Sequence, residues 1–195
     1  MKKVLIATTN NDKYNAVSKI FKKTIFNEKE FSIIKLTSDM NLPDEKEEGN
    51  NINRAKVKAL NAYNYLKDYD FDYIVGLDDA VRIKDGLEPN IKEYLNKILF
   101  ENYIDDGELY AFNRAYCIID KKGNTYEFTA DIPYIYHPLK NDIELKAYTY
   151  PLSKVSYPIG YDVPIEELNE EDEINYYLKY VKDEVTKIKI GGNNV

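Results

Sequence analysis

The chain has 195 residues, enough to bury a sizeable core in one domain, and its 27 basic and 34 acidic residues give a formal net charge of -7. This acidic balance argues against binding of a nucleic-acid polymer, because such binding needs many Lys and Arg side chains on the phosphates. The lack of an eighteen-residue apolar run or a signal-peptide core predicts a cytoplasmic protein. A single cysteine leaves no disulfide framework or zinc cluster. The one histidine, His137, has no serine or cysteine elbow near it in the sequence, so a histidine triad has no support.

The first predicted element is a buried strand at Lys3–Ala7, followed by the polar residues Thr8, Thr9 and Asn10. An amphipathic helix comes next, because apolar residues recur at three- and four-residue spacing from Tyr14 to Phe21. Free backbone N–H groups, hydroxyls and Lys13 at this helix start would suit a phosphate. The other interpretation is that these residues only cap the helix, and this segment alone favours capping.

A second strand is expected at Phe31–Leu36, and an acidic segment follows it from Thr37 to Asn51. Like charges repel, so such a run is either a solvated face, which is the default, or a place where a cation binds. The carboxylates in this segment are Asp39, Asp44, Glu45, Glu47 and Glu48.

The next helix is expected from Ile52 to Lys67 and carries Lys56 and Lys58. The apolar run Asp72–Leu77 then predicts a central strand, buried on both faces, that ends at Asp78 and Asp79. Ligands of open α/β sheets collect at the carboxyl ends of strands. Chemistry is therefore expected at this acidic pair.

The rest of the chain predicts a helix, a hairpin and a last helix, at Asn90–Phe100, Arg114–Asp120 with Thr125–Ile132, and Ile165–Lys187. Gly123 and Asn124 are expected to supply the positive φ angles of the hairpin turn. The fold class is therefore α/β, an elongated single domain over residues 1–190 with a central mixed sheet flanked by helices. Gly191–Val195 is expected to fray.

These elements give one constellation of charges: Lys13, an acidic loop, lysines on a helix, and the Asp78–Asp79 pair. Carboxylates suit Mg²⁺, which binds one or two of them while it keeps waters and phosphate oxygens. Lysines supply the counter-charge to a polyphosphate. Phosphoryl chemistry then needs positioning, charge neutralisation and a group that orients water.

Over about Lys3–Lys182, the order and spacing of the sequence motifs resemble those of the inosine triphosphate pyrophosphatases. These enzymes hydrolyse non-standard purine nucleoside triphosphates. That family opens with a strand and a T/S-x-N-x-x-K motif, matched by Thr8, Asn10 and Lys13. The other matching segments are Leu42–Gly49, Ala55–Ala59, Gly76–Ala80, Glu88–Asn90, Arg114–Cys117 and Gly160–Asp162. Several motifs in one order are far more specific than one.

The resemblance implies a homodimer that hydrolyses a nucleoside triphosphate with Mg²⁺ to a monophosphate and pyrophosphate, through attack of water at the α-phosphorus. It implies that Asp79 is the base for water, that Asp78 and Asp79 bind the metal with a loop acid, and that Lys13 and Lys58 hold phosphates. Further substrate contacts are expected at Thr8, Thr9, Asn10, Lys56, Tyr161, Asp162 and Tyr176.

Two registers fit the acidic loop. An A-x-x-K-A match with an E-x-G match selects Lys58 and Glu47, whereas the longer spacing after Leu42–Pro43 selects Lys56 and Asp44. The first register is preferred.

The base-reading motif departs from the family. The S-H-R of the last helix is replaced within Ile174–Tyr177, and Ile159 stands where an aromatic residue would stack on the base. A different base is therefore plausible, with tyrosines such as Tyr161 or Tyr176 as stacking partners. Two alternatives stay open: a pyrophosphatase for modified pyrimidine nucleotides, as in the septum-formation-inhibitor family, and a degenerate nucleotide-binding protein without catalysis.

Overall fold

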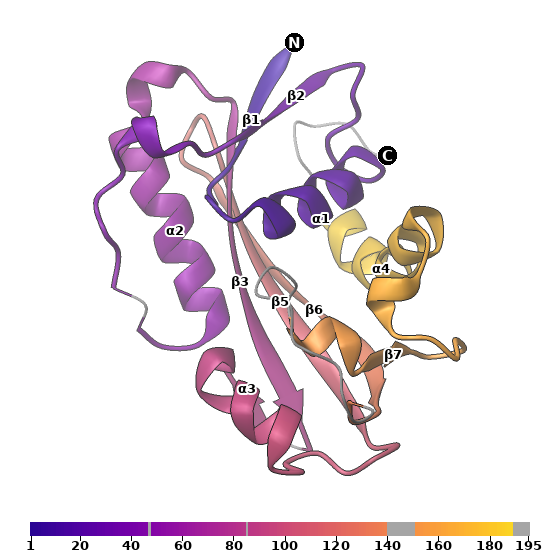
Figure 1. The fold of residues 1–195 in the computed structure, drawn as a ribbon. Coiled ribbons are helices and arrows are strands. Elements are labelled where there is room, and N and C mark those ends of the chain that lie inside the picture. The colour runs from indigo at the N-terminus through magenta and orange to yellow at the C-terminus, as the bar shows by residue number, and fades with distance from the viewer. Residues whose placement is uncertain (47, 85, 140–150, 189–195) are drawn as a thin grey trace.

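A computed structural model describes residues 1–46, 48–84, 86–139 and 151–188 of the chain (Figure 1). The described helices are α1 (Asn11–Lys22), α2 (Asn51–Tyr65), α3 (Ile91–Phe100) and α4 (Glu170–Thr186). The described strands are β1 (Lys2–Ile6), β2 (Phe31–Lys35), β3 (Tyr73–Ile83), β4 (Gly86–Glu88), β5 (Leu109–Asp120), β6 (Thr125–Tyr136) and β7 (Ser156–Pro158). The expected tail at Gly191–Val195 lies outside the described residues. None of the described helices is both long and apolar enough to cross a membrane.

One mixed sheet forms the centre of the molecule, as the sequence predicts. Its strand order is β2-β1-β3-β5-β6-β7, and β4 pairs with the far part of β3. β1 runs parallel to β2 and β3, whereas β5, β6 and β7 are antiparallel to their neighbours. The expected α/β class, with helices flanking a mixed sheet, is confirmed.

β3 is longer than the sequence suggests. The prediction that it ends at Asp78 and Asp79 is wrong, because the strand continues to Ile83. All of its residues pair with β5, and Val81–Ile83 also pair with β4. β1 stops where Ile6 pairs with Val75. Asp78 and Asp79 therefore lie in mid-strand, just past the carboxyl end of β1.

The hairpin turn and the start of the last helix also differ from the prediction. Of the two hairpin residues, only Gly123 has a positive φ, of 84°. The last helix begins at Glu170 and not at Ile165, because the side chain of Asn169 caps it by accepting a hydrogen bond from the backbone N–H of Asp172. Ile165–Glu167 form a separate 3₁₀ turn.

α2 packs on one face of the sheet at very close range. A Cβ atom at Gly76 would lie 2.0 Å from the carbonyl oxygen of Ala55 and 2.6 Å from the nitrogen of Ala59. Only glycine permits this approach of helix backbone to strand backbone. The contact fixes the position of α2, and hence of Lys58, over β3.

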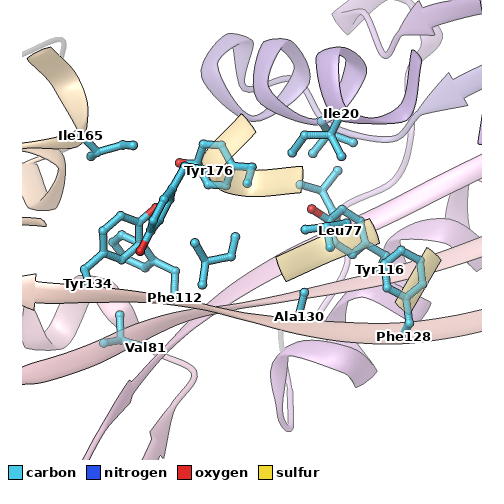
Figure 2. Packing of buried hydrophobic residues seen from close by; sticks show 14 of the residues in the cluster. Ile20, Leu77, Val81, Phe112, Tyr116, Phe128, Ala130, Tyr134, Ile165 and Tyr176 are labelled. Carbon is cyan, nitrogen blue, oxygen red and sulfur yellow. The ribbon is translucent and has the colours of Figure 1, made fainter. Parts of the chain in front are cut away.

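The opposite face of the sheet is covered by α1 and α4 and holds the main apolar core, to which α3 also contributes side chains (Figure 1). Aromatic rings dominate this core, and Tyr116 stacks on Phe128 with ring centroids 4.7 Å apart. Figure 2 shows these rings together with Tyr134, Phe112 and Tyr176 over the long strands. The two sheet faces thus differ: the small side chains of Ala115 and Cys117 pack with Ala55 and Ala59 of α2, whereas large aromatic side chains lie under α1 and α4.

Candidate active site

The acidic pair occupies both faces of β3, because successive side chains of a strand point to opposite sides. Asp78 is buried on the α2 face, where Lys58 contacts it. Asp79 faces α1 and α4, and its side chain is 14% exposed. Each carboxylate therefore has its shortest ion pair with a different layer, Asp78 with α2 and Asp79 with α1.

Two lysines hold this pair. Lys58 Nζ lies 2.6 Å from Asp78 Oδ1. Lys13, in the first turn of α1, places its Nζ 3.2 Å from Asp79 Oδ2 and 4.0 Å from Asp78 Oδ1. Because α1 starts where β1 ends beside β3, Lys13 can reach both carboxylates. The structure thus brings together the four residues that the sequence analysis placed at the reaction centre.

Arg114 is a fifth member of this cluster. It lies directly opposite Asp79 on β5, with its Nε 3.3 Å from Asp79 Oδ1, and its guanidinium lies 4.9 Å from the ring centroid of Tyr177. The buried Nε and Nη1 atoms have no hydrogen-bond partner among the described residues. In the sequence, Arg114 stands out only as part of a family motif, and no local pattern there predicts its place in the site.

The electrostatics of the cluster favour an anion. Burial raises the pKa of Asp79, but attraction to Lys13 and Arg114 outweighs burial and lowers it below its ordinary value. Asp79 is therefore ionised at neutral pH. Three cations surround two carboxylates, which leaves one unit of positive charge at a largely buried site. Such a site attracts phosphate oxygens.

The loop before α1 acts first as a helix cap. Asn10 Oδ1 accepts hydrogen bonds from the backbone N–H groups of Asp12 and Lys13, at 2.8 and 3.0 Å, and Thr8 Oγ1 accepts one from Asn10 N at 3.2 Å. Thr9 is exposed. Two N–H groups of the helix start are thus already occupied, so Lys13 Nζ is the group of this segment that faces the acids.

The structure separates the two candidate lysines of α2. Lys56 Nζ lies 2.7 Å from Glu127 of β6, away from the acidic pair, whereas Lys58 contacts Asp78. Of the loop acids, Asp44 is exposed and Glu47 lies outside the described residues. Within the described part of the chain, no three metal-ligating side chains gather in one place.

The tyrosines expected to stack on a base form a separate group. Tyr176 is buried, and its hydroxyl donates to the carbonyl of Pro133 and accepts a hydrogen bond from Ile159 N at 3.0 Å. Tyr161 is 36% exposed and meets Tyr176 edge to face. Asp162 is exposed. The position of Tyr176 is thus that of a core residue which anchors the segment around Ile159.

We expect Tyr176→Phe to destabilise the fold by about 1–2 kcal/mol, because it leaves the carbonyl of Pro133 and the N–H of Ile159 without their partner. Chemical denaturation would measure this loss. Michaelis constants for nucleotides should stay within a factor of about two, since hydrogen bonds inside the core do not touch a ligand. A large increase of the Michaelis constant at unchanged stability would instead make Tyr176 a substrate contact.

A pocket of about 190 Å³ lies between α1 and α4, on the same side of the sheet as Asp79. Tyr177 lines it and also contacts Arg114, so the pocket borders the charged cluster. Its other lining residues are Asp12, Asn15, Ala16, Lys19, Ile20, Glu173 and Ile174.

Comparisons with known proteins give similarity of structure alone. No protein-family model and no curated protein sequence matches the chain. Among solved structures, a nucleoside-triphosphatase, also described as a dITP/XTP pyrophosphatase, from Mycobacterium abscessus matches with a TM-score of 0.57 at 15% identity, over 91% of this chain and 93% of that one. A HAM1 protein from Coxiella burnetii matches with a TM-score of 0.61 at 12% identity, over 95% and 94% of the two chains. The Staphylococcus aureus Ham1 protein gives 0.57 at 14% identity, over 87% and 88%. The chain therefore has the fold of these proteins along nearly its whole length.

Proposed function

We propose that this chain is a divergent nucleoside triphosphate pyrophosphatase, which hydrolyses a nucleoside triphosphate to a monophosphate and pyrophosphate. The observation that carries the proposal is the convergence of Lys13, Lys58 and Arg114 on Asp78 and Asp79. It occurs on a fold shared with a protein described as a dITP/XTP pyrophosphatase. The sequence motifs of the inosine triphosphate pyrophosphatase family fall on the same residues.

Each charged group has a role in this reaction. Lys13 and Lys58 neutralise phosphate oxygens, which removes the repulsion between the triphosphate and the acidic pair. Asp79 orients the attacking water and accepts its proton. In this structure Lys13 holds the pKa of Asp79 down, which makes the carboxylate a weak base. A triphosphate that draws Lys13 away would raise that pKa and make Asp79 a better base.

The acidic pair also fits the Mg²⁺ that the family resemblance implies. Asp79 Oδ1 is buried and accepts no hydrogen bond from the described residues, among which its one ion-pair partner is Arg114 Nε at 3.3 Å, so its lone pairs are not all used. Two adjacent carboxylates match the one or two that Mg²⁺ takes from a protein when phosphates complete its shell. Asp78 and Asp79 would hold the ion, and a loop acid, Glu47 or Asp44, would join them. When bound, the ion would supply charge neutralisation at the phosphates.

The decisive experiment incubates the protein with Mg²⁺ and a panel of standard, deaminated and modified nucleoside triphosphates, and measures pyrophosphate and orthophosphate separately. We expect pyrophosphate in equal amount to the monophosphate. Orthophosphate alone would make the protein a phosphatase, and neither product would favour the non-catalytic alternative. Preference for modified pyrimidines would favour the septum-formation-inhibitor-like reading. The homodimer and the cytoplasmic location stay predictions of the sequence.

The two lysines of α2 provide a matched test of the register. Lys58→Gln removes the cation beside Asp78, and we expect kcat/KM to fall by about 10²-fold or more, as for loss of one charge-stabilising group. Lys56→Gln breaks an exposed pair with Glu127 and should change kcat/KM less than about threefold. Steady-state pyrophosphate release measures both. The reverse order of effects would select the Lys56 register.

A further inference from the structure

The pocket between α1 and α4 is small and defined. Its volume of about 190 Å³ is below the ~300–1,000 Å³ that is usual for sites enclosing a whole drug-sized ligand, so it suits one ring system of a nucleotide better than the whole molecule. Ala16, Ile20 and Ile174 give it apolar walls, and Asp12, Asn15 and Glu173 add polar groups. This mixture is typical of a site that orients a flat, polar ligand.

The pocket is positioned to take the base of a nucleotide whose phosphates reach the charged cluster. Asp12 precedes Lys13 in the first turn of α1, so the two sides of one helical turn serve the pocket and the cluster. Tyr177 connects them again, since it lines the pocket and lies under Arg114, which contacts Asp79. The pocket and the charged cluster are therefore neighbours on this side of the sheet.

Of the polar residues that line this pocket, Asp12 and Asn15 are exposed to water, whereas Glu173 is partly withdrawn from it. The Glu173 carboxylate makes no hydrogen bond or ion pair with any described residue, whereas the neighbouring Glu170 takes Lys19 at 3.0 Å. Burial raises its pKa above the ordinary value, although Lys19 and Arg114 oppose this. A carboxylate removed from water without a donor is unfavourable, so a ligand that brings N–H groups would gain binding energy here.

We propose that Glu173 reads the N–H edge of a guanine-type base in this pocket, which names the substrate class of the pyrophosphatase proposed above and rests on that proposal. A carboxylate accepts two adjacent N–H donors with its two oxygens, and the ring N1–H and the 2-amino group of guanine form such a pair. Hypoxanthine lacks the 2-amino donor. Xanthine places a carbonyl oxygen at that position, which repels a carboxylate. The selected base is thus guanine, or guanine modified away from this edge.

GTP and ITP provide the matched substrates, because they differ only in the 2-amino group. We expect the wild-type protein to hydrolyse GTP with a kcat/KM about tenfold or more above that for ITP, the usual effect of one bidentate pair. Glu173→Gln should bring the ratio of the two kcat/KM values close to one, mainly by lowering kcat/KM for GTP. Glu171→Gln is the control, because Glu171 is an exposed residue of the same helix outside the pocket, and it should keep the wild-type ratio.

Binding of GMP and IMP, measured by calorimetry without metal, separates failure of this inference from failure of the proposed function. Pyrophosphate release with equal GTP and ITP rates, or a ratio that Glu173→Gln leaves unchanged, overturns the reading by Glu173 and leaves the pyrophosphatase standing. If no nucleotide yields pyrophosphate, the proposed function fails. In that case, tighter binding of GMP than of IMP, with loss of this difference in Glu173→Gln, would support the base site alone. Equal binding of GMP and IMP to the wild-type protein would overturn the reading by Glu173.

Discussion

Asp79→Asn should reduce turnover by about 10³-fold or more, because the amide neither accepts the proton of water nor attracts a cation as a carboxylate does. The variant should also lose stability, by about 2–3 kcal/mol, since Arg114 is then left largely buried without its counter-charge. Pyrophosphate release and chemical denaturation would measure the two effects. The two effects together would place the acid in both the reaction and the fold.

The pH dependence of stability provides a check on the ion pair. The pKa of Asp79 is lower in the folded protein than its ordinary value, so the pair contributes fully above the unfolded pKa and is lost as pH falls through the folded pKa. The stability difference between wild type and Asp79→Asn should therefore shrink in acid. A difference that stays constant from neutral pH into acid, or full activity of the variant, would contradict the role given to this residue.

The site residues that sequence analysis could identify are those in short local patterns. Thr8, Asn10 and Lys13 follow a strand and start a helix, which predicts a polar turn. Asp78 and Asp79 follow an apolar run, which predicts a charged pair beside a strand. Both predictions depend only on residues that are neighbours in the chain. The hairpin likewise predicts the mixed sheet, because its turn and its two strands are adjacent.

Long-range pairing decides the features that were missed. β3 continues past Asp79 because β5 pairs with it throughout, and the same register sets Arg114 opposite Asp79. No local pattern contains that information. Lys56 and Lys58 look alike in sequence, yet residues two apart on a helix point about 200° apart, so only one of them faces β3.

Tyrosine roles were equally hidden in the sequence. The chain has 19 tyrosines, and composition does not distinguish one that stacks on a ligand from one that packs in the core. Tyr176 belongs to the core because its hydroxyl meets a carbonyl of β6. An aromatic side chain with a polar tip satisfies both environments, so burial becomes visible only in the folded structure.

Gly76→Ala should be the most destabilising single-methyl change at a described glycine of the sheet, because the new Cβ would lie 2.0 Å from the backbone oxygen of Ala55. Backbone cannot swing aside as a side chain can, so α2 must move off the sheet, at more than about 3 kcal/mol. Lys58 would move with it, and pyrophosphate release should fall in the protein that still folds. Gly86→Ala is the matched control: its nearest neighbour is 3.6 Å away, and its unfolding free energy should stay within about 0.5 kcal/mol of wild type. Equal denaturation midpoints for the two variants would show that α2 does not depend on this contact, and that the position of Lys58 over Asp78 has another cause.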